Sequence, residues 1–239
     1  MADAPQLLKD QDQRYRDTVI QMMRSQSYRE LAAAQLFGYG LQFVPDIKSL
    51  KFMVWHIQEE TEHYIAVADL YKNYTGESVE GWVNERLKAK PIPMVSSWLE
   101  LGLAQWLYDR GGFWQLQEYE NCSWAPYRSI IAKIIDEERG HQSHGARIAV
   151  ALCQDAANRQ EAQDFFAKWM RQGLLSFGRP NNEGNRYAIE VGLKKRDSAE
   201  VMKDFINDIR ADVKMAGLHW PTQEELNIEL PADIDWSLN

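Results

Sequence analysis

Residues 59–63, EETEH, and residues 137–141, EERGH, are the two stretches that decide how this chain folds. Each stretch contains one Glu-x-x-His motif: Glu60 with His63, and Glu138 with His141. The first copy lies in a segment without Gly or Pro from residue 47 to residue 75, which predicts one long helix. Since residues three apart share a face of a helix, each motif places a carboxylate beside an imidazole.

The helix predicted around the first copy carries a stripe that should face the core. Steps of three and four residues connect its members: Met53, His56, Glu60, His63, Val67 and Leu70. The helix predicted after Ser123 repeats the pattern with Ile131, Ile134, Glu138 and His141. Ionisable groups inside an apolar stripe cost free energy unless they are paired or bind a metal.

A bundle that holds two metal ions needs one further carboxylate from each of two other helices. Glu30 precedes the first motif and Asp109 precedes the second by nearly the same number of residues. Small residues lie near both, Ala33 and Gly112 among them, and would leave room for a substrate or O₂. We therefore predict two helical hairpins around one dimetal site, with the ligands Glu30, Glu60, His63, Asp109, Glu138 and His141.

The residue types suit redox metals. Four buried carboxylates repel one another, and two divalent cations would neutralise them. One imidazole per metal leaves coordination positions open, which favours two iron ions that act on O₂, although manganese or a mixed Fe/Mn pair fits the same ligands. His56 lies one turn before Glu60 on the same face, and we expect it to be catalytic, as a proton donor or hydrogen-bond partner of a metal-bound group.

Two of the proposed ligands have competing interpretations. Ser27 and Glu30 also match a capping box, in which Glu30 would bond to the backbone of Ser27. Glu118 and Glu120 compete with Asp109 for the fourth carboxylate position, although the repeat favours Asp109.

Other polar residues near the motifs are left with two interpretations. Glu59 and Glu137 are either hydrogen-bond partners of the ligand imidazoles or solvated side chains. His144 and His219 are expected to be ordinary histidines. Two basic clusters are either solvated or meet a phosphate-bearing substrate such as a CoA thioester: Arg86, Lys88 and Lys90, and Lys194, Lys195 and Arg196.

Gly and Pro are scarce and clustered, and strand signals are nearly absent, so we predict an all-α chain. The expected helices cover about residues 6–24, 27–43, 46–76, 94–121, 124–154, 158–178 and 199–218. A connection with one short helix spans 76–93, a loop spans 178–184, and an extended tail begins at 219. We expect one domain, 1–239, with a core bundle at about 27–155 and the C-terminal helices and tail at about 156–239.

Composition excludes several classes of protein. The 239 residues are 45% hydrophobic with a net charge of −8, which argues against nucleic acid as the main partner. Cys122 and Cys153 form no CxxC motif, so a reducing cytoplasm is expected. The N-terminus has no apolar signal region and no apolar run approaches the length of a membrane span, so we expect neither secretion nor a membrane.

Several segments resemble one known family, the phenylacetyl-CoA epoxidase catalytic subunits of phenylacetic acid catabolism. They are HIQEETEHYIAVADLY (56–71), LYDRGGF (107–113), APYRSIIAKIIDEERGHQSHG (125–145), SFGRPNNEGNRYAIEVGLKKRDSAEVMKDF (176–205) and MAGLHWPTQEELNIELP (215–231). The resemblance extends from about residue 25 to about residue 236. The chain departs from the family pattern at His56, where the family usually has Lys, and it is shorter than the family's catalytic subunits.

The resemblance implies a ferritin-like four-helix bundle with flanking helices, and a di-iron monooxygenase that epoxidises an aromatic CoA thioester. It implies the same six iron ligands that the repeat selects. The implied partners are the small-molecule substrate, O₂, an electron-donating reductase, and a homologous sister subunit or a second copy of the chain. A ferritin-like ferroxidase, a peroxide scavenger or a non-catalytic metal-binding subunit is the alternative.

Overall fold

The computed structural model of the chain describes residues 8, 11–232 and 234–236, and every regular element in this part is helical. The two longest N-terminal helices begin after capping aspartates. In α1 (Gln13–Gly40) the Asp12 carboxylate accepts a hydrogen bond from a backbone N–H of the first turn. In α2 (Ile47–Thr75) Asp46 does the same, and Gly76 ends the helix in the left-handed conformation that glycine adopts most readily.

The later elements are shorter, apart from α6. In chain order they are α3 (Glu80–Ala89), α4 (Trp98–Ala104), the π-helical segment η3 (Gln105–Asp109), α5 (Arg110–Leu116), α6 (Ala125–Cys153), α7 (Arg159–Ser176), α8 (Glu183–Glu190) and α9 (Ser198–Ala216). Short 3₁₀ turns adjoin them at Leu41–Phe43 (η2), Gln117–Tyr119 (η4) and Ala156–Asn158 (η5).

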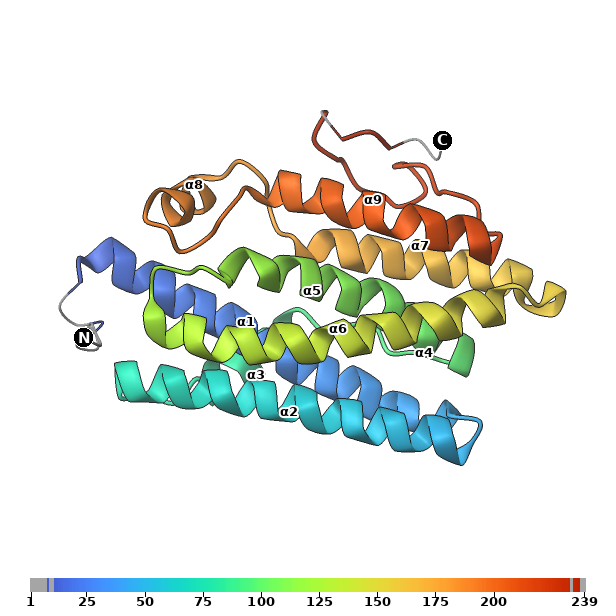
Figure 1. The fold of residues 1–239 in the computed structure, drawn as a ribbon, viewed down its shortest axis with the longest axis horizontal. Helices are drawn as coiled ribbons and strands as arrows, with labels where there is room; N and C mark the ends of the chain where they lie inside the picture. Colours follow the sequence, from blue (N-terminus) through green and yellow to red (C-terminus); the bar gives the residue numbers. More distant parts are fainter. Residues whose placement is uncertain (1–7, 9–10, 233, 237–239) are drawn as a thin grey trace.

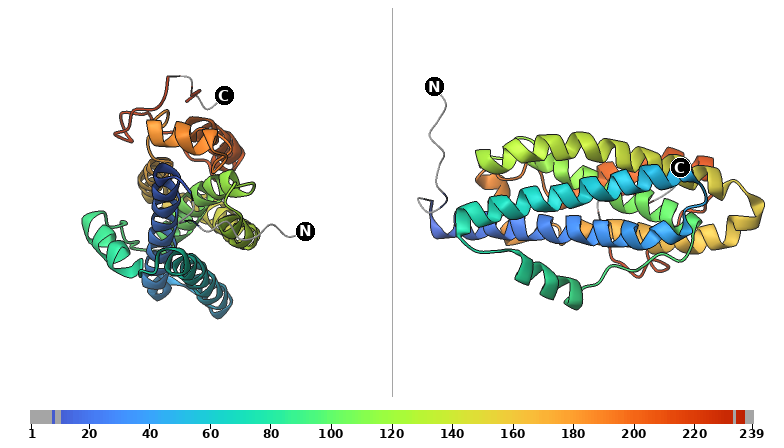
Figure 2. Two further views of the ribbon diagram at one scale, coloured as in Figure 1. Left: turned by 90° about the vertical axis from the view of Figure 1, so that its left-hand side faces the viewer. Right: turned by 90° about the horizontal axis from the view of Figure 1, so that it is seen from below.

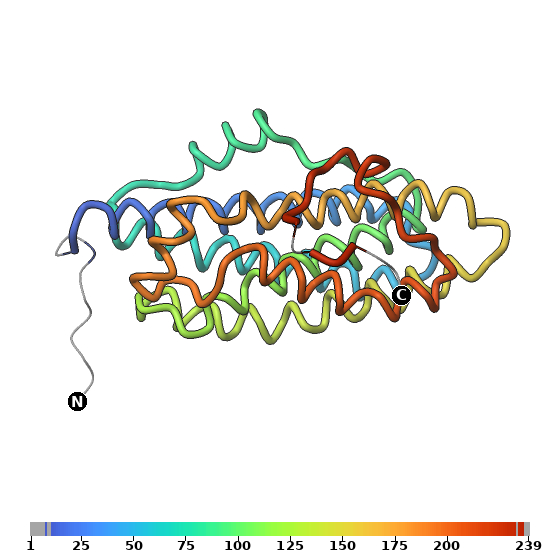
Figure 3. The backbone as a smooth tube through the Cα atoms, turned by 90° about the horizontal axis from the view of Figure 1, so that it is seen from above, coloured from blue at the N-terminus to red at the C-terminus, as the bar shows by residue number. Residues whose placement is uncertain are grey.

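Four helical rows run along the long axis and form a bundle: α1, α2, α6 and the row α4–η3–α5 (Figure 1). α7 packs on this last row, and α9 packs on α5 and α6. α3 lies to one side of the bundle, against α1 (Figure 2). The C-terminal tail passes over the layer formed by α7 and α9 (Figure 3).

The apolar core is divided into two clusters along the bundle axis. On α1, Met23 belongs to one cluster and Phe37 to the other. On α6, Ile131 and Ala149 are divided in the same way. The predicted ligands lie at the mid-helix positions between the clusters, so apolar layers close the polar centre of the bundle from both ends.

Gly145 allows α6 to approach η3 closely. A Cβ atom at this position would lie 2.5 Å from the backbone nitrogen of Trp106 and 2.7 Å from the carbonyl carbon of Gln105. The wider turn of a π-helix often marks a functional site, and here it contains two buried polar residues, Gln105 and Asp109. Glycine at 145 is therefore required by the packing of the two backbones.

The all-α class is confirmed, and the arrangement is consistent with a ferritin-like bundle. The predicted break at residues 24–27 is wrong, because this run contains no Gly or Pro and packing on α2 carries α1 through it. Ser27 is therefore mid-helix, and the capping-box interpretation of Glu30 is also wrong. Residues 6, 7, 9 and 10 of the first predicted helix lie outside the described residues.

Two further boundaries differ from the predictions. The single helix expected at 94–121 is instead the row α4–η3–α5, which the π-helical segment interrupts. α8 was not predicted, because the Pro and Asn residues of 178–184 favoured a loop; Asn182 in fact caps this helix. The division at about residue 155 stays a prediction. Among the described helices, none combines the length and the hydropathy that a membrane span needs.

Candidate metal centre

Four carboxylates meet between the two apolar clusters, one from each row of the bundle. Glu30 comes from α1, Glu60 from α2, Asp109 from η3 and Glu138 from α6, and each is at most 5% exposed. Ligand atoms of Glu30, Glu60, His63 and Glu138 all lie within 4.8 Å of one another, and those of His56, Glu60 and His141 form a second such group. Asp109 adjoins the second group, and the structure thus brings all six predicted ligands to one place.

Both motif imidazoles point Nδ1 into this centre. Nδ1 of His63 lies 3.5 Å from Oε2 of Glu30 and 3.4 Å from Oε1 of Glu138. Nδ1 of His141 lies 3.3 Å from Oε2 of Glu138 and 3.5 Å from Oε1 of Glu60. The two oxygens of Glu138 therefore face different imidazoles, so Glu138 lies between the two Glu-x-x-His motifs.

The outward nitrogens of the same imidazoles have carboxylate partners on the opposite helix. Nε2 of His141 on α6 lies 2.8 Å from Oε2 of Glu59 on α2. Nε2 of His63 on α2 lies 2.9 Å from Oε2 of Glu137 on α6. This exchange between the two motifs selects the hydrogen-bond partner interpretation of Glu59 and Glu137 over the solvated one.

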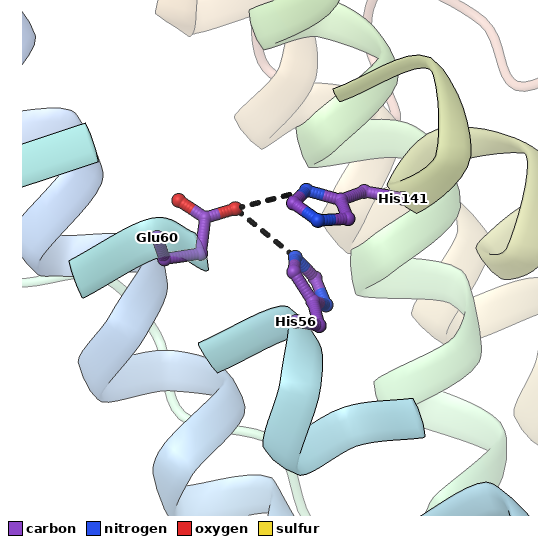
Figure 4. A group of neighbouring side chains, drawn as sticks. All are labelled: His56, Glu60 and His141. Atoms are coloured by element: carbon purple, nitrogen blue, oxygen red, sulfur yellow. Dashed lines mark hydrogen bonds and ion pairs between the residues drawn. The ribbon is translucent and has the colours of Figure 1, made fainter. Parts of the chain in front are cut away.

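His56 lies inside the centre. Its Nε2 is 3.0 Å from Oε1 of Glu60 and 3.5 Å from Oδ2 of Asp109. Figure 4 shows the rings of His56 and His141 both directed at Glu60, and the two ring centroids are 3.9 Å apart. Its place between two carboxylates fits either a hydrogen-bond donor or a ligand.

Burial and mutual repulsion separate the acidities of the carboxyl groups. Burial raises the pKa of Glu60, and the charge of Glu138 raises it further. Burial and the charge of Glu60 raise the pKa of Asp109 in the same way. For Glu138, burial acts upward, but the imidazoles of His141 and His63 outweigh it and lower the pKa well below its usual range.

The pKa values of the three imidazoles shift in opposite directions. Burial alone would lower the pKa of His63, but the carboxylates of Glu138 and Glu30 outweigh it and raise the pKa to about 12. The pKa of His141 rises to about 11, because Glu138 and Glu60 likewise overcome its burial. Burial and the charge of His141 lower the pKa of His56 well below its usual value.

The centre has the chemistry of a site for two divalent cations. Among the described residues, Nδ1 of His63 and Oδ2 of Asp109 are buried without a hydrogen-bond partner, although both lie within ion-pair distance of other side chains. The raised pKa values of Glu60 and Asp109 show that negative charge at these carboxyl groups lacks compensation, which divalent metal ions would supply. Carboxylate and imidazole donors suit iron and manganese. These side chains fit such a pair, and their ligand role stays a prediction.

Two cavities lie beside the carboxylates. An inner pocket of about 40 Å³ is lined by all four, and an outer cavity of about 700 Å³ extends between α1 and residues 177–201. Arg29 and Gln115 line both. Among the described residues the guanidinium of Arg29 has no hydrogen bond or ion pair, whereas Gln115 donates to Ser176 Oγ at 2.7 Å. Of these two residues, Arg29 is therefore the one whose side chain has no hydrogen bond or ion pair among the described residues.

The competing residues lie elsewhere. Glu118 is buried but binds the guanidinium of Arg196, and Glu120 is exposed, which leaves Asp109 as the fourth carboxylate of the centre. His219 is exposed in the tail, and His144 bonds to Gln105.

Some members of the two basic clusters line cavities, and their contact with a phosphate-bearing substrate stays a prediction. Lys194 lines the outer cavity, and Arg86 and Lys90 line a neighbouring one of about 230 Å³. Sequence reasoning missed Arg29, Gln115 and Gln105. Of these, Gln105 carries a signal, because it precedes Asp109 by four residues and shares its face.

This chain is similar to known proteins over most of its length. The family described as "Phenylacetic acid catabolic protein" matches residues 71–229, more than half of the chain. The chain is 24% identical over 238 residues to a 1,2-phenylacetyl-CoA epoxidase subunit of Escherichia coli (strain K12), covering 93% of this chain and 76% of that protein. The chain belongs to the phenylacetic acid catabolic protein family.

Proposed function

We propose that the chain is an oxygenase subunit that holds two iron ions and transfers oxygen from O₂ to an organic substrate, an aromatic or acyl CoA thioester. The observation that carries the proposal is the convergence of four buried carboxylates and two imidazoles from four helical rows. The name of the relative, an epoxidase subunit, supports the same reaction class.

The ligands in this proposal are the six predicted residues: Glu30, Glu60, His63, Asp109, Glu138 and His141. Manganese in one or both positions would fit the same donors. Bound iron would supply the reduction of O₂ and the transfer of one oxygen atom. Glu59 and Glu137 orient the imidazoles from outside, and the apolar clusters at both ends of the centre exclude water from it.

The cavities support an organic substrate with a large polar portion. The outer cavity has room for such a group and carries basic side chains at Arg29, Arg179 and Lys194, which suit phosphates. The inner pocket has room for O₂ or water but not for an aromatic ring, which needs a cavity of roughly 150 Å³. Arg29 must therefore turn aside when a ring reaches the carboxylates, and its lack of restraining partners among the described residues permits this.

Partners follow from the chemistry. Returning the metals to the reduced state requires an electron donor, and we propose a reductase in this role. The relative is one component of an epoxidase with several, so a sister subunit or a second copy of the chain belongs to the proposal. We also propose a cytoplasmic location for the protein.

The test is metal analysis combined with an ¹⁸O₂ assay. The purified chain is loaded with Fe(II) and supplied with a reductase, ¹⁸O₂ and a panel of acyl-CoA and aryl-CoA thioesters and free aromatic acids. The proposal expects two metal ions per chain and ¹⁸O in one product. Iron oxidation without any labelled product, with the sister subunit present, would instead support a ferroxidase or peroxide scavenger.

A further inference from the structure

A row of three buried polar side chains extends from the carboxylates through the bundle. Nδ1 of His56 lies 2.8 Å from Nε2 of Gln105, and Oε1 of Gln105 lies 3.0 Å from Nδ1 of His144. His56 is fully buried, Gln105 is 1% exposed and His144 is 9% exposed. The row therefore begins at Glu60 and leads outward across η3 to α6.

The surroundings hold this row in place. The ring of Phe52 stacks on His144 with centroids 3.4 Å apart and an angle of 14° between the planes. The close approach at Gly145 holds the backbone of Gln105 against α6. Buried polar side chains cost free energy unless each is satisfied, and apolar side chains would fill the same space without that condition. Packing alone therefore does not require a hydrogen-bonded network at this position.

The hydrogen bonds of the row depend on one another. Nε2 of Gln105 is an amide nitrogen that can only donate, and it faces Nδ1 of His56, so a neutral His56 ring carries its proton on Nε2, toward the oxygens of Glu60 and Asp109. A singly protonated ring then has a lone pair on Nδ1, which requires a donor. The amide of Gln105 supplies it through Nε2, and its Oε1 then accepts a hydrogen bond from the N–H at Nδ1 of His144.

We propose that Gln105 is a positioning residue that holds His56 in the tautomer with its proton on Nε2, directed at Glu60 and Asp109. In the metal-free chain His56 is then a hydrogen-bond donor to the carboxyl groups of Glu60 and Asp109. The importance of this tautomer for catalysis rests on the proposed function, whereas the tautomer itself does not depend on that function. No change of charge is involved, and the amide orients the row without conducting protons.

The test observes the tautomers directly in the metal-free, ¹⁵N-labelled full chain at pH 7. Long-range ¹H–¹⁵N correlation spectra distinguish a protonated from an unprotonated ring nitrogen, and His56→Gln and His144→Phe identify the two rings. We expect the proton of His56 on Nε2 and that of His144 on Nδ1. The measurement needs no metal and no substrate, so its result is separate from that of the oxygenase assay.

Two substitutions test the role of the amide. Gln105→Glu removes the donor, so Nδ1 of His56 should become protonated and its resonance should move to the protonated position. Gln105→Leu removes both partners, and both rings should lose their single tautomer. Gln142→Leu is the control, because Gln142 is also a buried amide on these helices but bonds to Arg110.

Either of two results would overturn the assignment: His56 in the unmodified chain with its proton on Nδ1, or spectra of both rings unchanged in Gln105→Glu. Circular dichroism and the melting temperature establish that each variant is folded. Gln105→Glu is nearly isosteric, and it keeps the test available if Gln105→Leu does not fold.

Discussion

The carboxylate of Glu59 on α2 lies 2.8 Å from Nε2 of His141 on α6, and Glu137 on α6 forms the matching contact with His63 on α2. Each Glu-x-x-His motif is thus oriented by the residue just before the glutamate of the other motif. A hydrogen bond at the outer nitrogen fixes the ring and makes the inner nitrogen a better metal ligand.

Removing one of these outer carboxylates should weaken metal binding. Glu59→Ala is expected to lower the affinity for Fe(II) by roughly 10- to 100-fold, as is usual for such partners. Anaerobic metal titration measures this. Glu62→Ala is the control, because Glu62 lies on the same helix but is about half exposed. Equal affinity of Glu59→Ala and Glu62→Ala would contradict the orienting role.

The metal-free protein should lose stability as the pH rises. Between the carboxylates, His63 and His141 have pKa values of about 12 and about 11, against an ordinary value of 6.5. The folded state therefore binds protons that the unfolded state releases, so this stabilisation is complete below about pH 6.5 and is lost toward pH 11 to 12. Urea unfolding at about pH 6 and about pH 9 measures it, and greater stability at the higher pH would contradict it.

Metal loading should release protons from the same groups. At pH 7 both imidazoles are protonated in the metal-free protein, and each must lose a proton to bind a metal ion. We expect at least two protons per chain on saturation with Fe(II), as measured with an indicator dye in weak buffer. Release of no protons would exclude His63 and His141 as ligands.

His56→Ala should separate turnover from metal binding. If His56 is a donor to the carboxylates, the variant keeps its metal content, and turnover falls by roughly 10² to 10⁴, the usual contribution of such a group. His219→Ala is the control, because His219 is exposed in the tail. Unchanged turnover would remove the catalytic role, and loss of one metal ion would make His56 a ligand.

Gly145→Ala should destabilise the fold. The added Cβ would meet backbone atoms of Trp106 and Gln105 at 2.5 to 2.7 Å, and backbone cannot turn aside as a side chain can. Overpacking of this kind costs about 1–3 kcal/mol of unfolding free energy. Gly140→Ala on the same helix should be tolerated, because its Cβ would lie 4.0 Å from the Trp55 side chain. Chemical denaturation of both variants makes the comparison.

Arg29→Ala should weaken the binding of an anionic substrate. Loss of one charge-assisted contact corresponds to roughly a 10-fold increase in KM for the preferred thioester. Arg16→Ala is the control, since Arg16 lies on the same helix but does not line the cavities. An unchanged KM would place the polar portion of the substrate away from Arg29.

The sequence predicted the all-α class and most of the candidate centre. Glu60 with His63 and Glu138 with His141 follow from spacing along single helices, because a helix brings residues three apart together wherever it lies. Glu30 and Asp109 followed from the repeat, although packing had to exclude Glu118, which binds Arg196 instead.

The sequence alone did not predict the contacts between helices. The exchange of Glu59 and Glu137 between motifs depends on the angle at which α2 and α6 meet, and the row from His56 through Gln105 depends on the π-helical turn in η3. Neither has a local signal, because the energy that selects them comes from packing between residues far apart in the chain. Spacing along the sequence therefore predicted the candidate metal ligands, whereas only the tertiary structure showed which residues contact them.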